Sequence, residues 1–479
     1  MSSIEQTSKQ SSATSTNREL IYSLAKREES VVPAIISRKT GSLSGAVEIS
    51  GSKNVGLKLL TTTPMFGEPL SLIGVPRNNQ VRYLIDLLRS FGTSVSIESD
   101  TSLGFDLTVR SDVLSRNRFE YCEIRRCRHM FLLAVSVLAR SGKVSVPMPG
   151  YSHYGARPID GQLAGLRKMG VRVLPVKEGM IQMEIPSSSL RGAEVFLPFP
   201  SNAVTEALLW AAVAAEGTTI IHGAAQEPET IELAKFFQAA DVEIRGVGTS
   251  ELVIHGRGLS ALRSPGDYRI IPDRIEIATL GAAVALCGGQ IRLIGVRNSH
   301  LAAVRAVLGD LGVRIVDENE DTWLLSAEGR PKAAGISTGP FPGFPTDALG
   351  PYIATLSVAS GISVVQERMW TNRLSLASEL KRLGAEISSP SGQVAIIQGV
   401  TNLSGAPVIG TDPRATVALT LAGLYAGGET TVFGVDLLDN AYDGLDEKLR
   451  RLGARVSRTV VSADDFHHVD PTYGRLEAF

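Results

Sequence analysis

Cysteine, net charge and long apolar runs are scarce in this chain, and each scarcity excludes a class of protein. The 479 residues include three cysteines, Cys122, Cys127 and Cys287, which argues against a disulfide framework and favours a reducing, cytoplasmic compartment. A formal net charge of −1 provides no general attraction to nucleic acid or to an anionic membrane. No apolar run is as long as the about 18 residues that a membrane-spanning helix needs. The polar N-terminus lacks the apolar core of a secretory signal, so we expect residues 1–33 to form a disordered polar tail.

Familiar signatures of cofactor binding are missing as well. No G-x-G-x-x-G segment follows a predicted strand, and the chain contains no Walker loop. Cys122 and Cys127 have the spacing C-x4-C, but neither a second cysteine pair nor a nearby histidine pair completes a zinc site. The sequence therefore predicts neither a dinucleotide fold nor a metal centre.

The chain does contain a repeated phrase, in which a helix-like segment ends at a short turn and leads into a strand-like run. The six turns lie at Gly92, Gly170, Ala240, Gly312, Gly384 and Gly453, with spacings of 78, 70, 72, 72 and 69 residues. A period of about 70 is too long for a solenoid unit and suits a small α/β unit. Between the turns lie Ala-rich, almost uniformly apolar segments of helical length, typical of buried helices. We predict three units in each of two domains, with helices inside and sheets outside.

Short polar segments precede several of the predicted helices and carry basic side chains. The cations in these segments are Lys53, Arg128, Arg157, Arg373 and Arg414. Helix N-termini beside Lys or Arg attract phosphate and carboxylate groups, and the planar guanidinium binds both in two-point geometry. The pattern predicts a site for a small, highly charged anion. For any one of these residues taken alone, a solvated side chain or a weak surface ion pair is the simpler interpretation.

Together the motifs resemble one family. SGSKN, GARPID, AAEGTTIIHGAAQEPE, PDRIE, FPTD, TNR, TDPRATVALTLAG and DEKLRRLGA occur in this order between residue 41 and about residue 458. This series is similar to the UDP-N-acetylglucosamine 1-carboxyvinyltransferases, relatives of 5-enolpyruvylshikimate-3-phosphate synthase. The resemblance implies a two-domain inside-out α/β barrel, with six repeats of about 70 residues, three per domain. It implies one domain of residues 34–53 and 268–479, a second of residues 54–267, and an active site in the cleft between them.

The implied reaction transfers the enolpyruvyl group of phosphoenolpyruvate to a hydroxyl group and releases phosphate. The implied acceptor is a uridine nucleotide, either UDP-N-acetylglucosamine or a UMP-like molecule. The resemblance implies no metal, organic cofactor, nucleic acid, membrane or obligate protein partner. It places Lys53 on phosphoenolpyruvate and Asp347 beside the acceptor hydroxyl as the base. The residues that match other anion, cleft or nucleotide contacts are Asn54, Arg128, Arg157, Asp160, Ser201, Arg373 and Arg414.

Three positions depart from the family pattern. Ser152 stands where the mobile loop usually has a cysteine, and a hydroxyl is a much weaker acid than a thiol. The adjacent His153 is a candidate proton donor, or simply a solvated loop residue. Asn440 replaces an arginine that clamps phosphoenolpyruvate, and Phe199 replaces a lysine that faces a diphosphate.

These departures leave several functions open. One is the peptidoglycan enzyme itself, and another is a paralogue for a different nucleotide, as in the biosynthesis of nucleoside antibiotics. A third is an inactive nucleotide-binding relative with a regulatory or scaffold role. A shikimate-like acceptor is disfavoured, because residues 157–160 resemble a uridine-binding strip.

Overall fold

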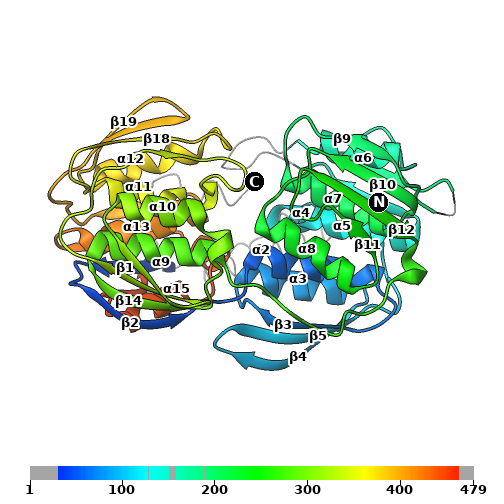
Figure 1. The fold of residues 1–479 in the computed structure, drawn as a ribbon, viewed down its shortest axis with the longest axis horizontal. Helices are drawn as coiled ribbons and strands as arrows, with labels where there is room; N and C mark the ends of the chain where they lie inside the picture. Colours follow the sequence, from blue (N-terminus) through cyan, green and yellow to red (C-terminus); the bar gives the residue numbers. More distant parts are fainter. Residues whose placement is uncertain (1–30, 128, 150–157, 188, 463–479) are drawn as a thin grey trace, which may run out of the picture.

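The structure, a computed structural model, describes residues 31–127, 129–149, 158–187 and 189–462. Figure 1 shows two lobes side by side. Each described lobe has its own hydrophobic core: one draws on residues 35–49 and 277–456, the other on residues 55–271. The first strand begins at Val31, slightly before the expected end of the polar tail at residue 33. Residues 1–30 lie outside the described part.

The first lobe contains three sheets of four strands, and helices pack against one face of each sheet (Figure 1). The strand orders are β15-β16-β14-β2, β17-β18-β20-β19 and β21-β22-β1-β23. Its elements are β1 (Val31–Arg38), β2 (Leu43–Glu48), α9 (Arg274–Cys287), β14 (Gly289–Ile294), η3 (Asn298–His300), α10 (Ala302–Asp310), β15 (Arg314–Asn319), β16 (Thr322–Ala327), β17 (Ile336–Ser337), η4 (Thr346–Ala348), α11 (Leu349–Leu356), β18 (Ile362–Gln366), η5 (Arg373–Leu376), α12 (Ala377–Arg382), β19 (Glu386–Ser391), β20 (Val394–Gln398), β21 (Pro407–Ile409), α13 (Pro413–Tyr425), β22 (Glu429–Phe433), α14 (Val435–Asp439), α15 (Leu445–Arg451) and β23 (Val456–Ser462).

The second lobe repeats this plan with sheets β13-β3-β5-β4, β6-β8-β7 and β11-β12-β10-β9. Its elements are α2 (Lys53–Thr62), η1 (Thr63–Met65), β3 (Leu70–Val75), α3 (Asn79–Ser90), β4 (Ser94–Thr101), β5 (Gly104–Arg110), α4 (Tyr121–Arg126), α5 (Met130–Ser141), β6 (Lys143–Pro147), α6 (Asp160–Lys168), β7 (Arg172–Val173), β8 (Met180–Glu184), β9 (Glu194–Phe196), α7 (Asn202–Ala214), β10 (Glu216–His222), α8 (Pro228–Ala239), β11 (Glu243–Arg245), β12 (Glu251–Arg257), η2 (Leu259–Ala261) and β13 (Asp267–Arg269).

Both lobes are built from one recurring order of strands and helices. A short strand, a buried helix, a second strand parallel to the first, an outer helix and a hairpin follow one another, as in the series from β9 to β12. Because each sheet buries only one face, the helices gather inside and the sheets form the outer surface. The six sheets stay separate, and none closes into a barrel within the described residues.

The repeated turn uses a left-handed residue after each outer helix. Five of the six turns have glycine there, with φ between 91° and 95°. The third copy differs, because Asp241 adopts φ 65° one residue after Ala240, where the sequence predicted the turn. Aspartate is among the few other residues that tolerate this conformation, since its short side chain can form local hydrogen bonds.

In the first lobe, α11 packs directly against the other inner helices, α9 and α13. Thr355 of α11 donates a hydrogen bond to the carbonyl of Ala282 in α9, 3.2 Å away. A Cβ atom added to Gly350, the second residue of α11, would lie 2.6 Å from the Arg414 carbonyl in α13. Only glycine permits this approach, which brings the N-termini of α11 and α13 together. The longest described helix, α9, has 14 residues, and no helix of the described part is long and apolar enough to cross a membrane.

The chain crosses between the lobes twice, and the two crossing segments are hydrogen-bonded to each other. The Asp273 N–H donates to the Ser50 carbonyl at 2.9 Å, and the Ser52 N–H donates to the Ile271 carbonyl at 2.7 Å. Gly51 lies between them, where a Cβ atom would come within 1.9 Å of the Gly74 carbonyl. The crossing is therefore a tight two-segment connection that leads directly into α2 and α9.

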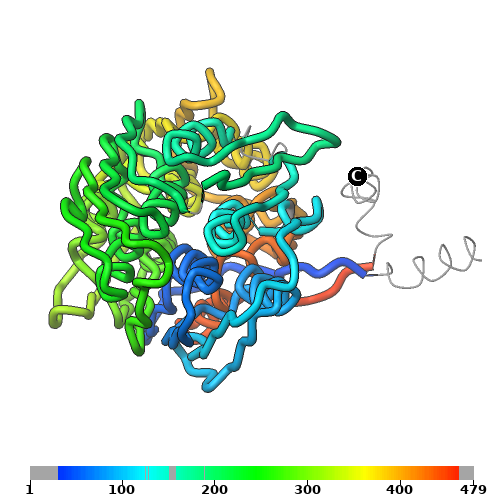
Figure 2. The backbone as a smooth tube through the Cα atoms, turned by 90° about the vertical axis from the view of Figure 1, so that its right-hand side faces the viewer, coloured from blue at the N-terminus to red at the C-terminus, as the bar shows by residue number. Residues whose placement is uncertain are grey.

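The two ends of the described chain lie side by side. Strands β1 and β23 pair antiparallel from Val31 opposite Ser462 to Ser37 opposite Val456. In Figure 2 these two strands extend together from the body of the molecule.

Candidate active site

Five of the six inner helices begin at or beside residues that the motif analysis highlighted. Lys53 is the first residue of α2, and Ser201 is the N-cap of α7. In the first lobe, Asp273 and Asp412 are the N-caps of α9 and α13, and Asp347 lies in η4 immediately before α11. The N-terminus of a helix has unsatisfied N–H groups and the positive end of the dipole. The fold therefore places polar side chains where helix ends favour negative charge.

Lys53 is held at the junction of the two lobes. Its backbone N–H donates to Asp273 Oδ2 at 3.0 Å, although 220 residues separate the two in sequence. The other oxygen of Asp273 accepts from the Ile275 and Glu276 N–H groups at 2.8 and 3.3 Å. Asn54 follows Lys53 in α2, and both side chains are half-buried. One carboxylate thus caps α9 and fixes the start of α2.

Asp347 lies between two buried arginines. Arg373 Nη2 donates to Asp347 Oδ1 at 2.9 Å, and Arg414 Nη2 donates to Oδ2 at 2.7 Å. The arginine side chains are 1% and 5% exposed, whereas the Asp347 side chain is 28% exposed. Charge-assisted hydrogen bonds to both oxygens fix the orientation of the carboxylate and leave part of it accessible. The arrangement presents an acid and two cations within one small region.

Further contacts support this cluster. The guanidinium of Arg414 lies over the ring of Tyr442, 5.4 Å from its centroid. The Tyr442 hydroxyl is 2.9 Å from Thr279 of α9, so α9, α13 and the segment after α14 are linked behind Asp347. Burial raises the pKa of Tyr442, with Arg414 acting in the opposite direction.

Glu367 is a buried residue that the sequence analysis missed. Its carboxylate accepts hydrogen bonds from the hydroxyls of Thr338 and Thr346 at 3.1 and 2.8 Å. It also accepts from the N–H groups of Met369 and Trp370 at 2.7 and 3.0 Å. Because Thr346 precedes Asp347, Glu367 anchors the segment that carries Asp347. An acid directly after β18 was the available signal, but spacing alone does not reveal its partners.

The remaining predicted residues are distributed unevenly. Asp160 begins α6 and is exposed, and Ser201 is half-buried. Phe199 is 51% exposed close to the start of α7. Half-buried Asn440 ends α14. Arg128, Ser152, His153 and Arg157 lie outside the described residues, and their predicted roles are untested by the structure.

Arg77, a cation of the second lobe that the sequence analysis also missed, pairs with Asp443, three residues after Asn440. Arg77 Nε donates to both oxygens of Asp443, at 3.0 and 3.1 Å, and the Arg77 N–H donates to the same carboxylate. Asp443 is buried, and the pair joins the two lobes. The segment in which Asn440 replaces an expected arginine is therefore tied to a different arginine.

Among the described residues, a buried lysine–glutamate pair lies in each lobe. Lys58 of α2 contacts Glu206 of α7 at 2.6 Å, and Lys448 of α15 contacts Glu276 of α9 and the Ser50 hydroxyl. Burial raises the pKa values of both glutamates, and the neighbouring lysines only partly offset this effect. These pairs hold the inner helices in register.

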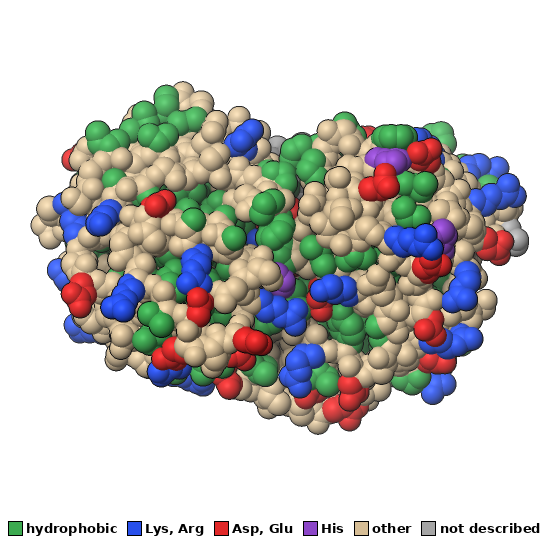
Figure 3. Space-filling view, viewed as in Figure 1, with side chains coloured by type: hydrophobic (Ala, Val, Ile, Leu, Met, Phe, Trp, Pro, Cys, Tyr) green, Lys and Arg blue, Asp and Glu red, His purple; other side chains and the backbone are tan. Residues whose placement is uncertain are grey.

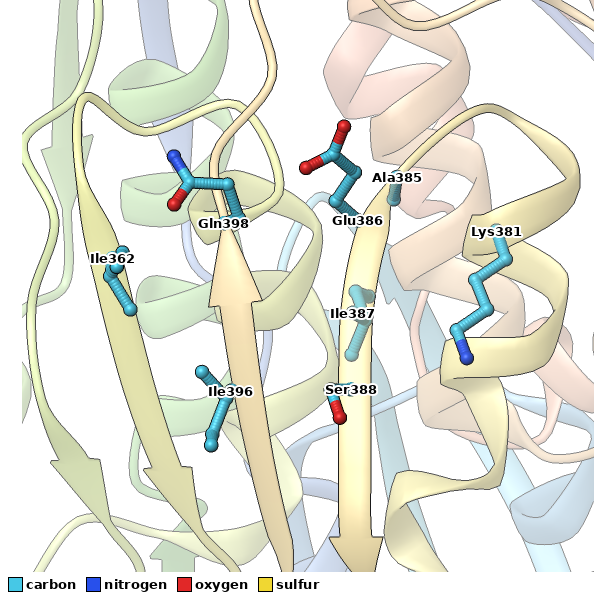
Figure 4. Close-up of a pocket in the computed structure, with 8 residues that line it drawn as sticks. All are labelled: Ile362, Lys381, Ala385, Glu386, Ile387, Ser388, Ile396 and Gln398. Atoms are coloured by element: carbon cyan, nitrogen blue, oxygen red, sulfur yellow. The ribbon is translucent and has the colours of Figure 1, made fainter.

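A cavity of about 440 Å3 lies away from these residues. It opens on the outer face of the β17-β18-β20-β19 sheet, between Ile362, Ile396 and Lys381 (Figure 4). Its lining includes none of the described site residues. Figure 3 shows a notch between the two lobes at the upper edge of this view. Lys381 is the one cation among the described residues that line the cavity, so the cavity does not match the multiply cationic anion site that the motifs predict. In the described part of the chain, no three His, Cys, Asp or Glu side chains gather to hold a metal ion.

Comparisons with known proteins agree with the motifs. The family model described as EPSP synthase (3-phosphoshikimate 1-carboxyvinyltransferase) matches residues 37–449. The UDP-N-acetylglucosamine 1-carboxyvinyltransferase of Paracoccus denitrificans is 39% identical over 90% of this chain and 99% of its own length. The enzyme of the same name from Gloeobacter violaceus is 40% identical over 88% of this chain and 89% of its own.

Solved structures show the same fold. The enolpyruvyl transferase NikO from Streptomyces tendae superposes with a TM-score of 0.79 at 21% identity, over 90% of this chain and all of its own. An EPSP synthase from Acinetobacter baumannii gives 0.68 at 18% identity, over 89% of this chain and all of its own. The predicted fold class is confirmed, with separate sheets in place of a closed barrel. The chain therefore belongs to the EPSP synthase family and is an enolpyruvyl (carboxyvinyl) transferase.

Proposed function

We propose that this enzyme transfers the enolpyruvyl group of phosphoenolpyruvate to a hydroxyl of UDP-N-acetylglucosamine, or of another uridine nucleotide such as UMP, and releases phosphate. The observation that carries the proposal is the partly exposed Asp347 carboxylate fixed by Arg373 and Arg414. A base beside two cations suits a reaction between an alcohol and an anionic substrate.

The roles follow from the chemistry. The acceptor oxygen adds to C2 of phosphoenolpyruvate while C3 gains a proton, and the intermediate then loses phosphate as C3 loses a proton. Asp347 takes the hydroxyl proton. Lys53 binds phosphoenolpyruvate at the start of α2, where the helix dipole also favours an anion. Arg373 and Arg414 add positive charge in the cleft between the lobes.

The proposed site also includes residues that the structure leaves undescribed. Arg128 and Arg157 bind anionic groups, and Ser152 or His153 serves the proton transfer at C3. Asn54, Asp160 and Ser201 contact the acceptor. The reaction requires no cofactor or partner protein, and the three cysteines fit a cytoplasmic enzyme.

Two observations bear on the identity of the acceptor, and they favour different molecules. The relatives at 39% and 40% identity carry the name of UDP-N-acetylglucosamine as acceptor. Phe199, an exposed aromatic side chain, offers no charge to a diphosphate where a lysine is usual in the family. We propose UDP-N-acetylglucosamine first and a uridine monophosphate second.

An inactive nucleotide-binding paralogue is the alternative function. It is favoured by Asn440, which supplies no charge in place of the clamping arginine, and by Ser152 in place of the loop cysteine. Losing one charge-assisted hydrogen bond costs about 1.5–3 kcal/mol, which slows an enzyme without abolishing activity.

Phosphate release from phosphoenolpyruvate tests the proposal, with UDP-N-acetylglucosamine, UMP and a shikimate-type alcohol run in parallel. Release with either uridine nucleotide, together with a product that carries the enolpyruvyl group by mass spectrometry, is the expected result. Release only with the shikimate-type alcohol, or binding of the nucleotides without any release, would contradict it.

A further inference from the structure

Helix α8 of the second lobe meets the start of α9 of the first lobe through a buried ion pair. Arg274, the first residue of α9, donates from Nε to Glu229 Oε1 at 2.9 Å and from Nη2 to Oε2 at 3.1 Å. The two side chains are 11% and 6% exposed. Burial opposes ionisation of Glu229, but Arg274 outweighs it, so the pKa of Glu229 is lowered. A two-point pair of this kind fixes orientation as well as distance.

This pair lies one residue away from the contact that holds Lys53. Asp273 precedes Arg274, caps α9 and accepts the Lys53 N–H at 3.0 Å. The orientation of the first turn of α9 therefore sets the position of the Asp273 carboxylate beneath Lys53. Glu229 is therefore connected to Lys53 through two consecutive residues, Arg274 and Asp273.

The same junction touches the segment that leads to Asp347. The Arg274 guanidinium lies 6.0 Å from the centroid of the Phe341 ring. Glu227, two residues before Glu229, accepts the Phe341 N–H at 3.4 Å. Phe341 precedes Asp347 by six residues. The ion pair is thus adjacent to the residue that contacts Lys53 and close to a segment six residues before Asp347.

We propose that Glu229 is a positioning residue for the transfer reaction: through Arg274 it holds the first turn of α9 against α8, and so fixes Asp273 and the start of α2 with Lys53. This inference rests on the proposed function. Glu229 is buried and acts through other residues, so it is not a catalytic residue. Loss of the two-point pair between Arg274 and Glu229 displaces Lys53 by a fraction of an ångström. This displacement weakens binding of phosphoenolpyruvate and lowers the rate of the transfer reaction.

Glu232 provides a matched control on the same helix. It lies three residues after Glu229 and also contacts the first lobe, through Arg297 at 3.8 Å. It accepts a hydrogen bond from the Tyr268 hydroxyl at 3.0 Å. Arg297 is 45% exposed, and its pair with Glu232 is separate from the pair of Arg274 with Glu229. A Glu232→Gln change therefore removes a contact between the lobes without touching the chain that leads to Lys53.

The experiment compares Glu229→Gln, Glu232→Gln and the double variant Glu229→Gln/Arg274→Gln. Steady-state phosphate release gives KM for phosphoenolpyruvate and kcat, and urea unfolding gives stability. The rate at which a trace acylating reagent modifies the Lys53 amine, measured by mass spectrometry without substrates, reports its surroundings directly.

The proposal expects Glu229→Gln to raise KM for phosphoenolpyruvate about 10-fold and to change the Lys53 acylation rate, while Glu232→Gln leaves both within about twofold. The double variant contains no unpaired buried charge, so it regains stability but keeps the raised KM and the altered acylation rate. A purely structural role predicts instead that KM recovers together with stability.

Two results would overturn the inference. One is a KM and an acylation rate within twofold of the unmodified protein in Glu229→Gln. The other is an equal change in Glu232→Gln. If the unmodified protein releases no phosphate, the proposed function fails, whereas the acylation rates still show whether Glu229 positions Lys53.

Discussion

The two lobes share one architecture but begin their inner helices differently. In the first lobe, the carboxylates of Asp273 and Asp412 cap α9 and α13, and Asp347 precedes α11. In the second lobe, Lys53 begins α2, and in the described structure neither Ser52 nor Ser201 caps its helix with its side chain. A cation at a helix N-terminus is electrostatically unfavourable. It is explained if an anionic substrate binds there, so the proposed function assigns the anion to the second lobe and the base to the first.

The largest effect should come from Asp347→Asn. Removal of a general base typically lowers kcat by about 10²- to 10⁴-fold. Phosphate release with phosphoenolpyruvate and the best acceptor measures it, and Asp310→Asn, an exposed acid at the end of α10, is the control. A loss of less than about 10-fold would place the base elsewhere.

The buried pairs test whether both lobes are built alike. Lys448→Met leaves the buried Glu276 of the first lobe without its lysine partner, and Lys58→Met does the same to Glu206 of the second lobe. Each should lower the free energy of unfolding by about 3–5 kcal/mol, because a buried charge loses its partner. Urea unfolding measures this, and a second change of the glutamate to Gln should restore most of the loss. A loss in one lobe only would break the comparison.

These variants should also respond to pH with a known sign. The folded pKa of Glu276 is raised above its ordinary value of 4.5, and loss of Lys448 raises it further. A carboxyl with a raised folded pKa stabilises most below its unfolded pKa and loses that contribution as pH rises through the folded pKa. Lys448→Met should therefore lose more stability at pH 8 than at pH 5. An equal loss at both values would show that the variant does not raise the folded pKa of Glu276 further, as when the carboxylate finds another cationic partner.

The helix caps give a smaller, more specific test. Asp412→Ala removes hydrogen bonds to the N–H groups of Arg414 and Ala415, and should cost about 0.5–2 kcal/mol. Ser201→Ala removes no cap in the described structure and should change stability by less than about 0.5 kcal/mol. Thermal unfolding without substrate compares them. Equal losses would mean that the two lobes treat their helix ends alike.

The smallest expected effect concerns His300 at the junction. Burial, aided by Arg297, lowers its pKa to about 4. A histidine with a lowered folded pKa binds fewer protons when folded, so stability should fall as pH drops from about 6.5 towards 4. In His300→Gln, the loss of unfolding free energy over this pH range should be smaller by about 1 kcal/mol, after allowance for solvent screening. Urea unfolding at several pH values across the range measures it. An unchanged slope would show that His300 does not titrate with folding.

Local signals predicted much of the fold. The glycine turns, the Ala-rich buried helices and the six units all follow from short-range pattern, because each unit repeats the same local chemistry. The third turn was misplaced by one residue, since Asp241 does not signal a left-handed conformation as glycine does. The expectation of a barrel was too strong, because strand spacing does not show whether separate sheets close on one another.

The site was predictable only in part. Lys53, Asp347, Arg373 and Arg414 lie in recognisable motifs. The residues that support this site cannot be identified from local sequence. The pair of Lys53 with Asp273 joins residues 220 positions apart, and the pair of Arg274 with Glu229 joins residues 45 positions apart. Such contacts depend on which helix ends meet at the junction, and that becomes visible only in three dimensions.

The most direct test of the division between the lobes is calorimetric titration of phosphoenolpyruvate into Lys53→Met and Asp347→Asn. Lys53→Met should lose most of its affinity. Asp347→Asn should bind phosphoenolpyruvate at least as tightly as the unmodified protein does, since Arg373 and Arg414 keep their charge. Its rate of phosphate release should nevertheless be far below that of the unmodified protein. Normal binding by Lys53→Met together with lost binding by Asp347→Asn would contradict the assignment of the anion to the second lobe and the base to the first.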